Sequence, residues 1–368
     1  MPSLTVYYDD VFLAHDPPAG AFVLPAHDWL AVEEPHPDRP ARIENVRHAI
    51  ECAFSDLVRW GPVEPATRTQ LERVHEPSYL DAFFDAAAGD RLTPETGVGE
   101  GTVEAAEHAA GAAVSAAERA LDSDPDEVVY APVRPSGHHA QPATADGFCY
   151  LNNVAVAAAH ALATGRADRV AVVDWDVHHG NGTQEAFYGR DDVLVVSLHN
   201  DFGSWGPHHL QTGGVEESGE GAGEGYTVNV PLPPGTGDAG YAHAVDRIVE
   251  PALCEYDPDL LLVSAGQDPG FLDPMGRNVV TVAGFTELGR RVRALADGCA
   301  GGALALVQEG GYQQSHLAFA TVGVLEGALG VESGVREPFF PLGEHLPPVE
   351  RWVEAARRAH VEHWPLSG

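Results

Sequence analysis

Short apolar runs alternate with longer segments of helical periodicity through most of the chain. Short apolar runs bounded by polar or turn residues are typical of strands that are buried on both faces. The expected strands are Val128–Ala131, Val170–Val173, Val193–Leu198, Leu260–Ser264 and Ala303–Gln308. The expected helices are Thr102–Leu121 (with Thr102 as its cap), Asn153–Ala163, Gly240–Tyr256, Thr286–Asp297 and Ser315–Leu329. This alternation predicts an α/β fold with a mainly parallel central sheet and helices on both faces.

Polar residues follow four of the five expected strands directly. Arg134–His139 follows the first strand and Asp174–His179 the second, while Ala265–Asp268 follows the fourth and Glu309–Tyr312 the fifth. Ligand sites in such sheets lie beyond the carboxyl ends of the strands. We therefore expect these four segments to meet in one functional site.

The second segment carries residues that can bind a metal ion. Asp174, Asp176 and His178 alternate at a strand end, and together with Asp268 they supply two carboxylates and one imidazole for one divalent ion. A catalytic zinc ion takes three protein ligands and keeps one position open. The plainer alternative is that Asp176 and His178 only cap the following helix, but three other polar strand ends favour the metal site.

The first and last segments carry acid–base and donor groups. His138 and His139 follow a glycine-containing turn, and hydrolysis of an amide needs a base for the water and an acid for the leaving amine. We expect Asp174 to orient His138 and Asn181, a neutral partner, to orient His139. Tyr312 follows two glycines, and its phenol can donate to the oxyanion that forms on the carbonyl. Taken alone, a buried core tyrosine would be the simpler interpretation.

Composition narrows the functional classes. The 368 residues include 55 acidic and 21 basic residues, for a net charge of −34. Every one of these basic residues is arginine. Such a surface repels phosphates, so direct binding of nucleic acid is excluded from our expectations. Adaptation to a salt-rich cytoplasm explains this charge more simply than steering of cationic substrates, because the acidic residues are spread along the chain.

No repeat, long linker or apolar run long enough to span a bilayer interrupts the chain, and we expect one domain over residues 1–368, in the cytoplasm. No signal peptide is visible at the N-terminus. The Gly/Glu-rich stretch 213–225 is interpreted as a surface loop. The four cysteines, none in a CxxC pair, suggest no disulfide framework.

The motifs in order resemble the histone deacetylase superfamily. They are R-P-x-G-H-H-A, G-F-C-Y-L-N-N, D-W-D-V-H-H-G-N-G-T, S-L-H, S-A-G-x-D, D-P-M-G and E-G-G-Y, with H-P-D-R-P and V-H-E-P before them. The resemblance extends from about Tyr8 to Gly330 and leaves 331–368 as an extension packed on the domain. Asn181, Glu309 and the loop between His15 and His36 are similar to class II members and their bacterial relatives. The implied fold is the arginase–deacetylase α/β fold.

The resemblance implies a role for each matching residue. The zinc ligands are Asp176, His178 and Asp268; His138 and His139 are the acid–base pair, with His139 as the base; and Tyr312 stabilises the transition state. The substrate tunnel includes Phe148 and Gly147. An inner potassium ion is implied at Asp174, Asp176, His178, Ser197 and Leu198, and an outer one at Phe187, Arg190, Val193 and Tyr226.

Several positions depart from the family pattern. Gln267 stands where an aromatic residue is usual, and Pro269 directly follows the metal-binding Asp268. The second tunnel wall is assigned to Trp205, in a segment that is longer than usual. No aspartate that grips a peptide backbone is evident at the rim, where Glu100 lies near the expected place.

The expected activity is zinc-dependent hydrolysis of an acylated amine, most simply acetyl-lysine in a protein or peptide. An acetylpolyamine hydrolase is the first alternative, but Met275 stands where those enzymes carry an acidic gatekeeper. A ureohydrolase would need a D-x-H-x-D arrangement for two metals, and a non-enzymatic binding protein would not need every reacting group. A homo-oligomer formed through the N-terminal loop is a further expectation.

Overall fold

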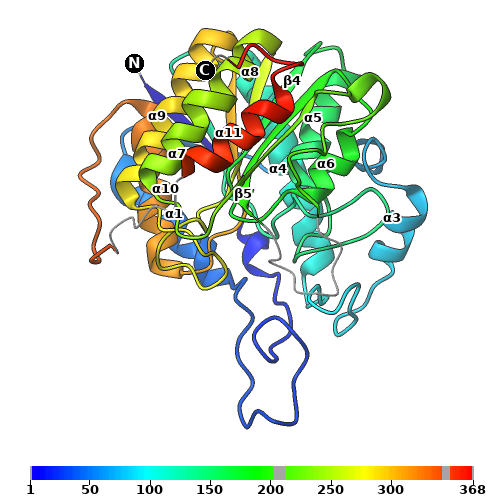
Figure 1. Cartoon of the computed structure of the whole chain (residues 1–368). Helices are drawn as coiled ribbons and strands as arrows, with labels where there is room; N and C mark the ends of the chain where they lie inside the picture. The colour runs from blue at the N-terminus through cyan, green and yellow to red at the C-terminus, as the bar shows by residue number, and fades with distance from the viewer. Residues whose placement is uncertain (1, 202–211, 342–348, 367–368) are drawn as a thin grey trace.

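The computed structural model describes residues 2–201, 212–341 and 349–366. At its centre is one eight-stranded sheet in which all neighbouring strands pair in parallel (Figure 1). In spatial order the strands are β2 (Val58–Gly61), β1 (Ser3–Tyr7), β3 (Glu127–Ala131), β8 (Leu304–Gln308), β7 (Leu260–Ala265), β4 (Val170–Asp174), β5 (Val193–Asn200) and β6 (Thr227–Leu232). The five strands expected from the sequence are confirmed to within two residues at each end.

Three strands, β1, β2 and β6, were not expected. Their sequences are SLTVY, VRWG and TVNVPL, in which polar residues or proline interrupt the apolar run. β2 and β6 are the edge strands, so each pairs on one side only. A search for continuous apolar runs therefore finds the fully buried strands and misses those nearer the edges.

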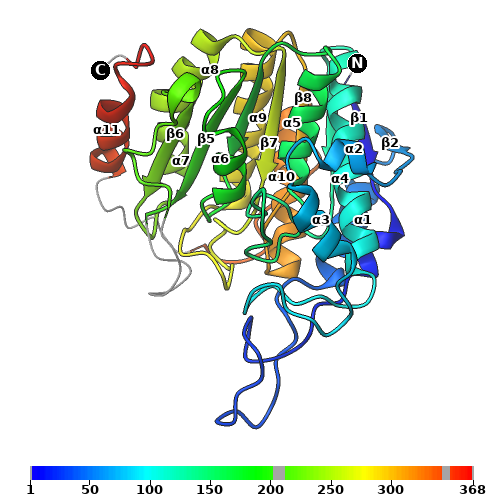
Figure 2. The same cartoon turned by 90° about the vertical axis from the view of Figure 1, so that its right-hand side faces the viewer.

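Helices cover both faces of the sheet (Figure 2). In chain order the helical segments are η1 (Asp10–Leu13), α1 (Pro40–Phe54), α2 (Arg68–Leu71), α3 (Pro77–Phe84), α4 (Thr102–Asp122), α5 (Asn153–Ala163), α6 (Asn181–Phe187), η2 (Gly221–Gly223), α7 (Asp238–Ala244), η3 (Val245–Val249), α8 (Glu250–Tyr256), α9 (Val282–Cys299), α10 (Gln314–Leu329) and α11 (Val349–His360). Helices α3 to α6 contribute to the core on one face, and α1 and α7 to α11 to the core on the other. The prediction of helices on both faces is confirmed.

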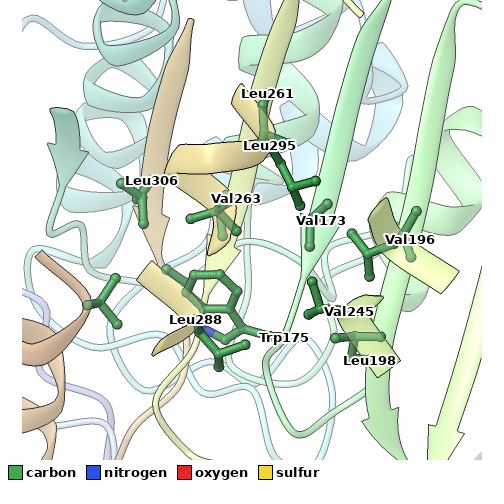
Figure 3. Close-up of a cluster of buried hydrophobic side chains, with 14 of the residues drawn as sticks. Val173, Trp175, Val196, Leu198, Val245, Leu261, Val263, Leu288, Leu295 and Leu306 are labelled. Atoms are coloured by element: carbon green, nitrogen blue, oxygen red, sulfur yellow. The ribbon is translucent and has the colours of Figure 1, made fainter. Parts of the chain in front are cut away.

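Alternate residues of the central strands fill the two cores. In β4, Ala171 and Val173 belong to one cluster, while Val170 and Val172 belong to the other. Figure 3 shows Val173 beside Leu295 of α9, and Trp175 beside Leu288 of the same helix. Because side chains of successive strand residues point to opposite faces, the part of a strand that is covered on both faces is apolar, as Val170–Val173 of β4 are.

Two local expectations were wrong. Thr102 is the first residue of α4 and not its cap: the cap is Gly101, at a φ of 68°, and Thr102 Oγ1 instead accepts the Gly99 N–H at 2.8 Å. The structure also joins Cys254 to Cys299 in a disulfide, although the sequence suggested none. These residues lie 45 positions apart, at the ends of α8 and α9, and such a pairing depends on tertiary contact that spacing does not reveal.

The segment before α1 extends away from the body as a long loop (Figures 1 and 2). It exposes Trp29, at 91%, together with Leu30 and Val32. Expected oligomer formation through this loop stays a prediction. Among the described helices, none is both long and apolar enough to cross a bilayer.

Arginine makes the surface ion pairs. Arg68, for example, binds Glu72 and Asp81 at 2.6 and 2.8 Å, and Arg290 binds Glu287 at 2.6 Å. The planar guanidinium can contact two carboxylates or both oxygens of one, which an ammonium cannot do with the same geometry.

A buried ionic network ties the N-terminal region to the sheet. Asp38 lies between Arg42 and Arg134, and all three side chains are at most 2% exposed. Arg134 donates to Asp38 Oδ1 at 2.9 Å and to the Phe12 carbonyl at 2.9 Å, and Arg42 donates to the Glu309 carbonyl at 2.8 Å. Burial raises the pKa of Asp38, but the two guanidinium groups outweigh it and hold that pKa well below its ordinary value.

We expect Asp38→Ala to lower the free energy of unfolding by about 3–5 kcal/mol, because it leaves two buried guanidinium groups without their carboxylate. Urea denaturation measures the change. Asp10→Ala is the matched control, since Asp10 pairs with Arg47 at 3.0 Å on the surface, where loss of an ion pair has little effect. Equal stability of the two variants would contradict the prediction.

Candidate metal and catalytic site

Four strand ends bring the expected site residues together. β4, β7 and β8 are neighbours with aligned ends, since Asp174 is paired in register with Ser264 and Ala265 with Gln308. Asp176 and His178 follow β4, Asp268 follows β7, and the ligand atoms of these three residues lie within 4.8 Å of one another. All three side chains are buried. The geometry thus forms one compact donor cluster from segments that are far apart in the sequence.

Backbone groups orient the two carboxylates of this cluster. Gly310 donates its N–H to Asp176 Oδ2 at 2.7 Å, and Val177 donates to Asp268 Oδ1 at 2.9 Å. The remaining oxygens, Asp176 Oδ1 and Asp268 Oδ2, face His178 Nδ1 at 3.1 and 3.0 Å. A side chain at position 310 has no room, because a Cβ there would lie 2.2 Å from Asp268 Oδ2.

This cluster has the chemistry of a cation site. Asp268 Oδ2 is fully buried and, among the described residues, accepts no hydrogen bond, although it lies 3.0 Å from His178 Nδ1. Burial and the neighbouring Asp176 raise the pKa of Asp268 to about 8. A buried carboxylate oxygen without a donor is stabilised by a positive ion. Two carboxylates and one imidazole therefore fit a divalent metal ion.

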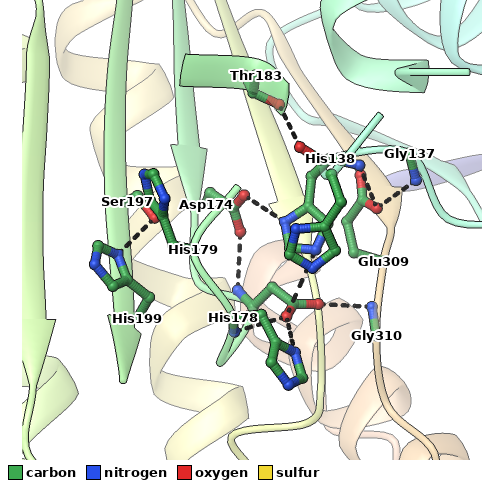
Figure 4. A network of polar contacts seen from close by, with 12 residues as sticks. Gly137, His138, Asp174, His178, His179, Thr183, Ser197, His199, Glu309 and Gly310 are labelled. Atoms are coloured by element: carbon green, nitrogen blue, oxygen red, sulfur yellow. Dashed lines mark hydrogen bonds and ion pairs between the residues drawn. The ribbon is translucent and has the colours of Figure 1, made fainter. Parts of the chain in front are cut away.

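The two adjacent histidines lie beside the cluster and have different partners. Figure 4 shows the His138 ring between β4 and the loop after β8. His138 Nδ1 is 2.9 Å from Asp174 Oδ2, and its Nε2 is 3.7 Å from Asp176 Oδ1. His139 Nδ1 is 2.7 Å from Asn181 Oδ1. Both pairings are those expected from the sequence.

The surroundings of the two imidazoles shift their pKa values in opposite directions. Burial lowers the pKa of His138, but Asp176 and Asp174 outweigh burial and raise it well above its ordinary value. Burial lowers the pKa of His139, and His138 and His178 lower it further. One imidazole is therefore suited to hold a proton and the other to accept one, the division of roles that acid–base catalysis requires.

Glu309 fixes the backbone that carries these histidines. It accepts the N–H groups of Gly137 at 2.7 Å and His138 at 3.2 Å (Figure 4). Burial raises the pKa of Glu309 to about 7. The resemblance had identified Glu309 only as a class II feature, without this contact.

Tyr312 is held at the rim of the cluster by a carboxylate and a guanidinium. Asp273 Oδ2 accepts the Tyr312 N–H at 2.6 Å, and the Arg42 guanidinium lies 4.6 Å from the centre of the Tyr312 ring. Burial raises the pKa of Tyr312 well above its ordinary value. The phenol therefore keeps its proton and can act as a hydrogen-bond donor.

Of the residues expected around the substrate, some lie close to Tyr312 and others do not. Phe148, at a φ of 69°, makes an edge contact with Tyr312 at 5.9 Å between ring centres, and Gly147 precedes it in the same turn. Met275 lies in a turn, and its N–H donates to Asp273 Oδ1 at 2.8 Å. The other oxygen of this carboxylate accepts the Tyr312 N–H. Glu100 is exposed and pairs through its backbone with Asp16. Trp205 lies outside the described residues.

The residues assigned to the inner potassium ion lie on β4, on β5 and in the loop after β4, and those assigned to the outer ion lie near the starts of β5 and β6 and at the end of α6. Asp174 is paired in register with Ser197, whose hydroxyl contacts His199 Nδ1 at 2.9 Å, and Leu198 follows it in β5. At the second site, Phe187 accepts the Arg190 N–H at 2.9 Å, and Tyr226 accepts the Val195 N–H at 2.9 Å, beside Val193 at the start of β5.

Sequence reasoning missed the residues that hold the reacting groups from behind. Asp38, Arg42 and Asp273 were given no role, although Asp38 belongs to the H-P-D-R-P motif and Asp273 to D-P-M-G. An aspartate that begins a proline turn is a common backbone acceptor, which is the signal available for Asp273. Of the two arginines that bind Asp38, Arg42 is four residues away but Arg134 comes from a distant segment, so no local pattern reveals the whole network.

Comparison with known proteins shows the family. The model of the histone deacetylase domain matches residues 36–328, and the chain belongs to the histone deacetylase family. It is 39% identical to histone deacetylase 8 of Arabidopsis thaliana, covering 98% of this chain and 97% of that one. It is 38% identical to a histone deacetylase-like amidohydrolase of Pseudomonas aeruginosa, over 90% and 87% of the two chains. The crystal structure of the HDA15 HD domain is similar, with a TM-score of 0.84 at 32% identity over 99% of this chain and 97% of that chain. The predicted family and fold are thereby confirmed, and the chain is a histone deacetylase-like amidohydrolase.

We expect Asp268→Ala to abolish stoichiometric binding of a divalent metal, because it removes one of the two carboxylates of the cluster. Elemental analysis after dialysis against a limiting concentration of metal measures this directly. Asp273→Ala is the control, since Asp273 binds backbone N–H groups and is not among the three clustered ligands. Full metal content in Asp268→Ala, or equal loss in both variants, would contradict the assignment.

Proposed function

We propose that this chain is a zinc-dependent deacylase that hydrolyses the amide of acetyl-lysine in a protein or peptide. The observation that carries the proposal is the pair of histidines beside the Asp176–His178–Asp268 cluster, one held by a carboxylate and the other by an amide. Zinc suits a site with three nitrogen and oxygen ligands and an open position. When bound, zinc polarises the acyl carbonyl and lowers the pKa of water to about 7.

The side chains divide the proton transfers of the reaction. His139 Nε2 takes a proton from the attacking water, since its Nδ1 is engaged with Asn181. The Tyr312 phenol donates a hydrogen bond to the carbonyl oxygen as that oxygen becomes negative. His138, beside Asp174, supplies a proton to the nitrogen as the C–N bond breaks. The products are a carboxylate and a free amine.

We also propose that potassium ions occupy the inner and outer sites. The register pairing of Asp174 with Ser197 supports the inner site, and the turn from Phe187 to Arg190 supports the outer one. An inner monovalent cation would offset part of the negative charge of Asp174 and Asp176 without competing for the divalent site.

We expect Tyr312→Phe to lower kcat by roughly 10²–10³, the usual effect of removing one oxyanion donor. KM and metal content stay near the wild-type values, because the phenol is not among the clustered ligands. Steady-state kinetics with an acetyl-lysine peptide measures the loss. Tyr8→Phe removes a hydroxyl that donates to Asp10 Oδ1 at 2.9 Å in an exposed contact, and serves as the control. An unchanged kcat would mean that Tyr312 only packs.

The proposed substrate preference rests on Met275. Its turn is tied through Asp273 to Tyr312, and Phe148 contacts Tyr312 from another segment. An apolar side chain suits the methylene stem of an acylated lysine and gives a distal polyamine cation nothing to pair with. The net charge of −34 favours polyamines at long range, but salt screens this attraction beyond about 8 Å at physiological ionic strength.

We expect a higher kcat/KM for acetyl-lysine peptides than for acetylspermidine or acetylputrescine. Met275→Glu shifts the preference toward the polyamines, because it places a carboxylate near their distal ammonium groups. Met275→Gln is the matched control, with nearly the same shape and no charge. A wild-type preference for acetylpolyamines would contradict the gatekeeper interpretation and leave the remaining chemistry intact.

A further inference from the structure

A further acidic residue, Asp146, lies behind the Asn181 side chain. Asn181 Nδ2 donates to Asp146 Oδ2 at 2.8 Å, while Asn181 Oδ1 lies 2.7 Å from His139 Nδ1. Gln141 Nε2 donates to the same Asp146 oxygen at 3.2 Å. Asp146 is 3% exposed, while Asn181 and Gln141 are half-buried. A continuous chain of polar contacts therefore links a buried carboxylate to the imidazole that we assign as the base.

The donor or acceptor character of each group sets the direction of the hydrogen bonds between Asp146, Asn181 and His139. An ionised carboxylate only accepts hydrogen bonds, so the Asn181 amide must present its NH₂ to Asp146. The Asn181 carbonyl oxygen then faces His139, and this oxygen is also only an acceptor. His139 must therefore carry its proton on Nδ1, so Nε2 is the ring nitrogen whose lone pair can accept a proton.

The amide of Asn181 alone would not determine which nitrogen of His139 carries the proton. Its oxygen and its NH₂ have nearly the same shape, and rotation by half a turn exchanges them. With the NH₂ against His139, Nδ1 would have to accept and Nε2 would carry the proton. An imidazole protonated on Nε2 cannot take a proton from water at that atom, so one amide orientation is active and the other is not.

The backbone holds Asp146 in place for this contact. Asp146 and Cys149 exchange backbone hydrogen bonds of 3.1 and 2.7 Å, which close the turn that contains Gly147 and Phe148. Gln141 N–H also donates to the Thr144 carbonyl at 2.9 Å. The turn thus fixes the backbone of Asp146, and the amides of Asn181 and Gln141 bind its carboxylate.

We propose that Asp146 is a positioning residue that fixes the amide of Asn181, and through it the proton of His139 on Nδ1. This inference rests on the proposed function, in which His139 Nε2 is the base. It extends the pair His139–Asn181 to a relay of three residues whose last member is charged.

The test is Asp146→Asn, which keeps the size of the side chain and removes its acceptor-only character. The introduced amide can accept from Gln141 and Asn181 or, if both invert, donate to both, so the inactive orientation becomes accessible. Reversal of the histidine tautomer lowers kcat by about 10⁴ in serine proteases, and with two orientations open here we expect a loss of roughly 10- to 100-fold. KM and zinc content stay unchanged.

The exchange Asp146→Asn/Asn181→Asp provides a rescue. A carboxylate at position 181 again presents only acceptor oxygens to His139 Nδ1, and the amide at position 146 donates to it. We expect this double variant to regain most of the kcat lost in Asp146→Asn. A residue that merely supports the fold would not be rescued by moving its charge one step along the chain of contacts.

A second readout does not need activity. In metal-free protein with ¹⁵N-labelled histidine, NMR reports the protonated nitrogen of His139, assigned with His139→Gln. We expect Nδ1–H in the wild type and a mixture with Nε2–H in Asp146→Asn. Asp238→Asn is the control, because Asp238 also accepts two hydrogen bonds, from Thr281 at 2.8 and 2.7 Å, but in another part of the fold.

The outcomes separate the two proposals. A wild-type kcat and an unchanged His139 tautomer in Asp146→Asn would overturn the role of Asp146, as would a double variant no better than the single one. A wild type inactive on every acylated amine would overturn the proposed function, whereas the NMR result would still decide the relay.

Discussion

Four carboxyl groups are buried at one edge of the sheet, and many of the other groups of the site lie where they offset the negative charge of these four. Asp174, Asp176, Asp268 and Glu309 are each at most 1% exposed. Like charges that close in a poorly polarisable interior repel strongly unless positive groups intervene. His138 lies between two of them, backbone N–H groups bind Asp176, Asp268 and Glu309, and the remaining Asp268 oxygen faces a position suited to a cation. The parallel sheet makes this arrangement feasible, because aligned strand ends deliver these groups from distant parts of the sequence.

The same crowding explains how two neighbouring residues of one type acquire different properties. His138 faces the carboxylates, and His139 faces an amide and other imidazoles. Neither residue is distinguished by its own chemistry. Environments that drive two pKa values apart are the usual way in which an enzyme obtains an acid and a base at one pH. The carboxylates that can bind a metal therefore also set the protonation of the residues beside it.

The sequence predicted the centre of this molecule better than its periphery. Apolar runs identified β3, β4, β5, β7 and β8, because the part of a strand that is covered on both faces is apolar. β1, β2 and β6 mix polar and apolar residues, and no such rule identifies them. Asp176, His178 and Asp268 could be found because they follow buried strands directly. Asp38 and Asp146 could not, since each also binds a partner from a distant segment, Arg134 and Asn181 respectively. Asp273 left a local signal in the proline turn that it begins, but its contact with Tyr312 forms only on folding. The Cys254–Cys299 disulfide was missed for the same reason.

The use of arginine for the surface ion pairs has a chemical consequence for an enzyme of this kind. A deacylase works among acyl donors and acylated amines, and the ε-amine of lysine is the usual protein nucleophile toward such donors. This chain has no lysine, and its guanidinium groups keep their protons at physiological pH. Its surface therefore offers no lysine amine to be acylated, and no acyl-lysine of its own competes with the substrate. The use of arginine alone in the surface ion pairs therefore also means that the enzyme carries no lysine that could become acylated.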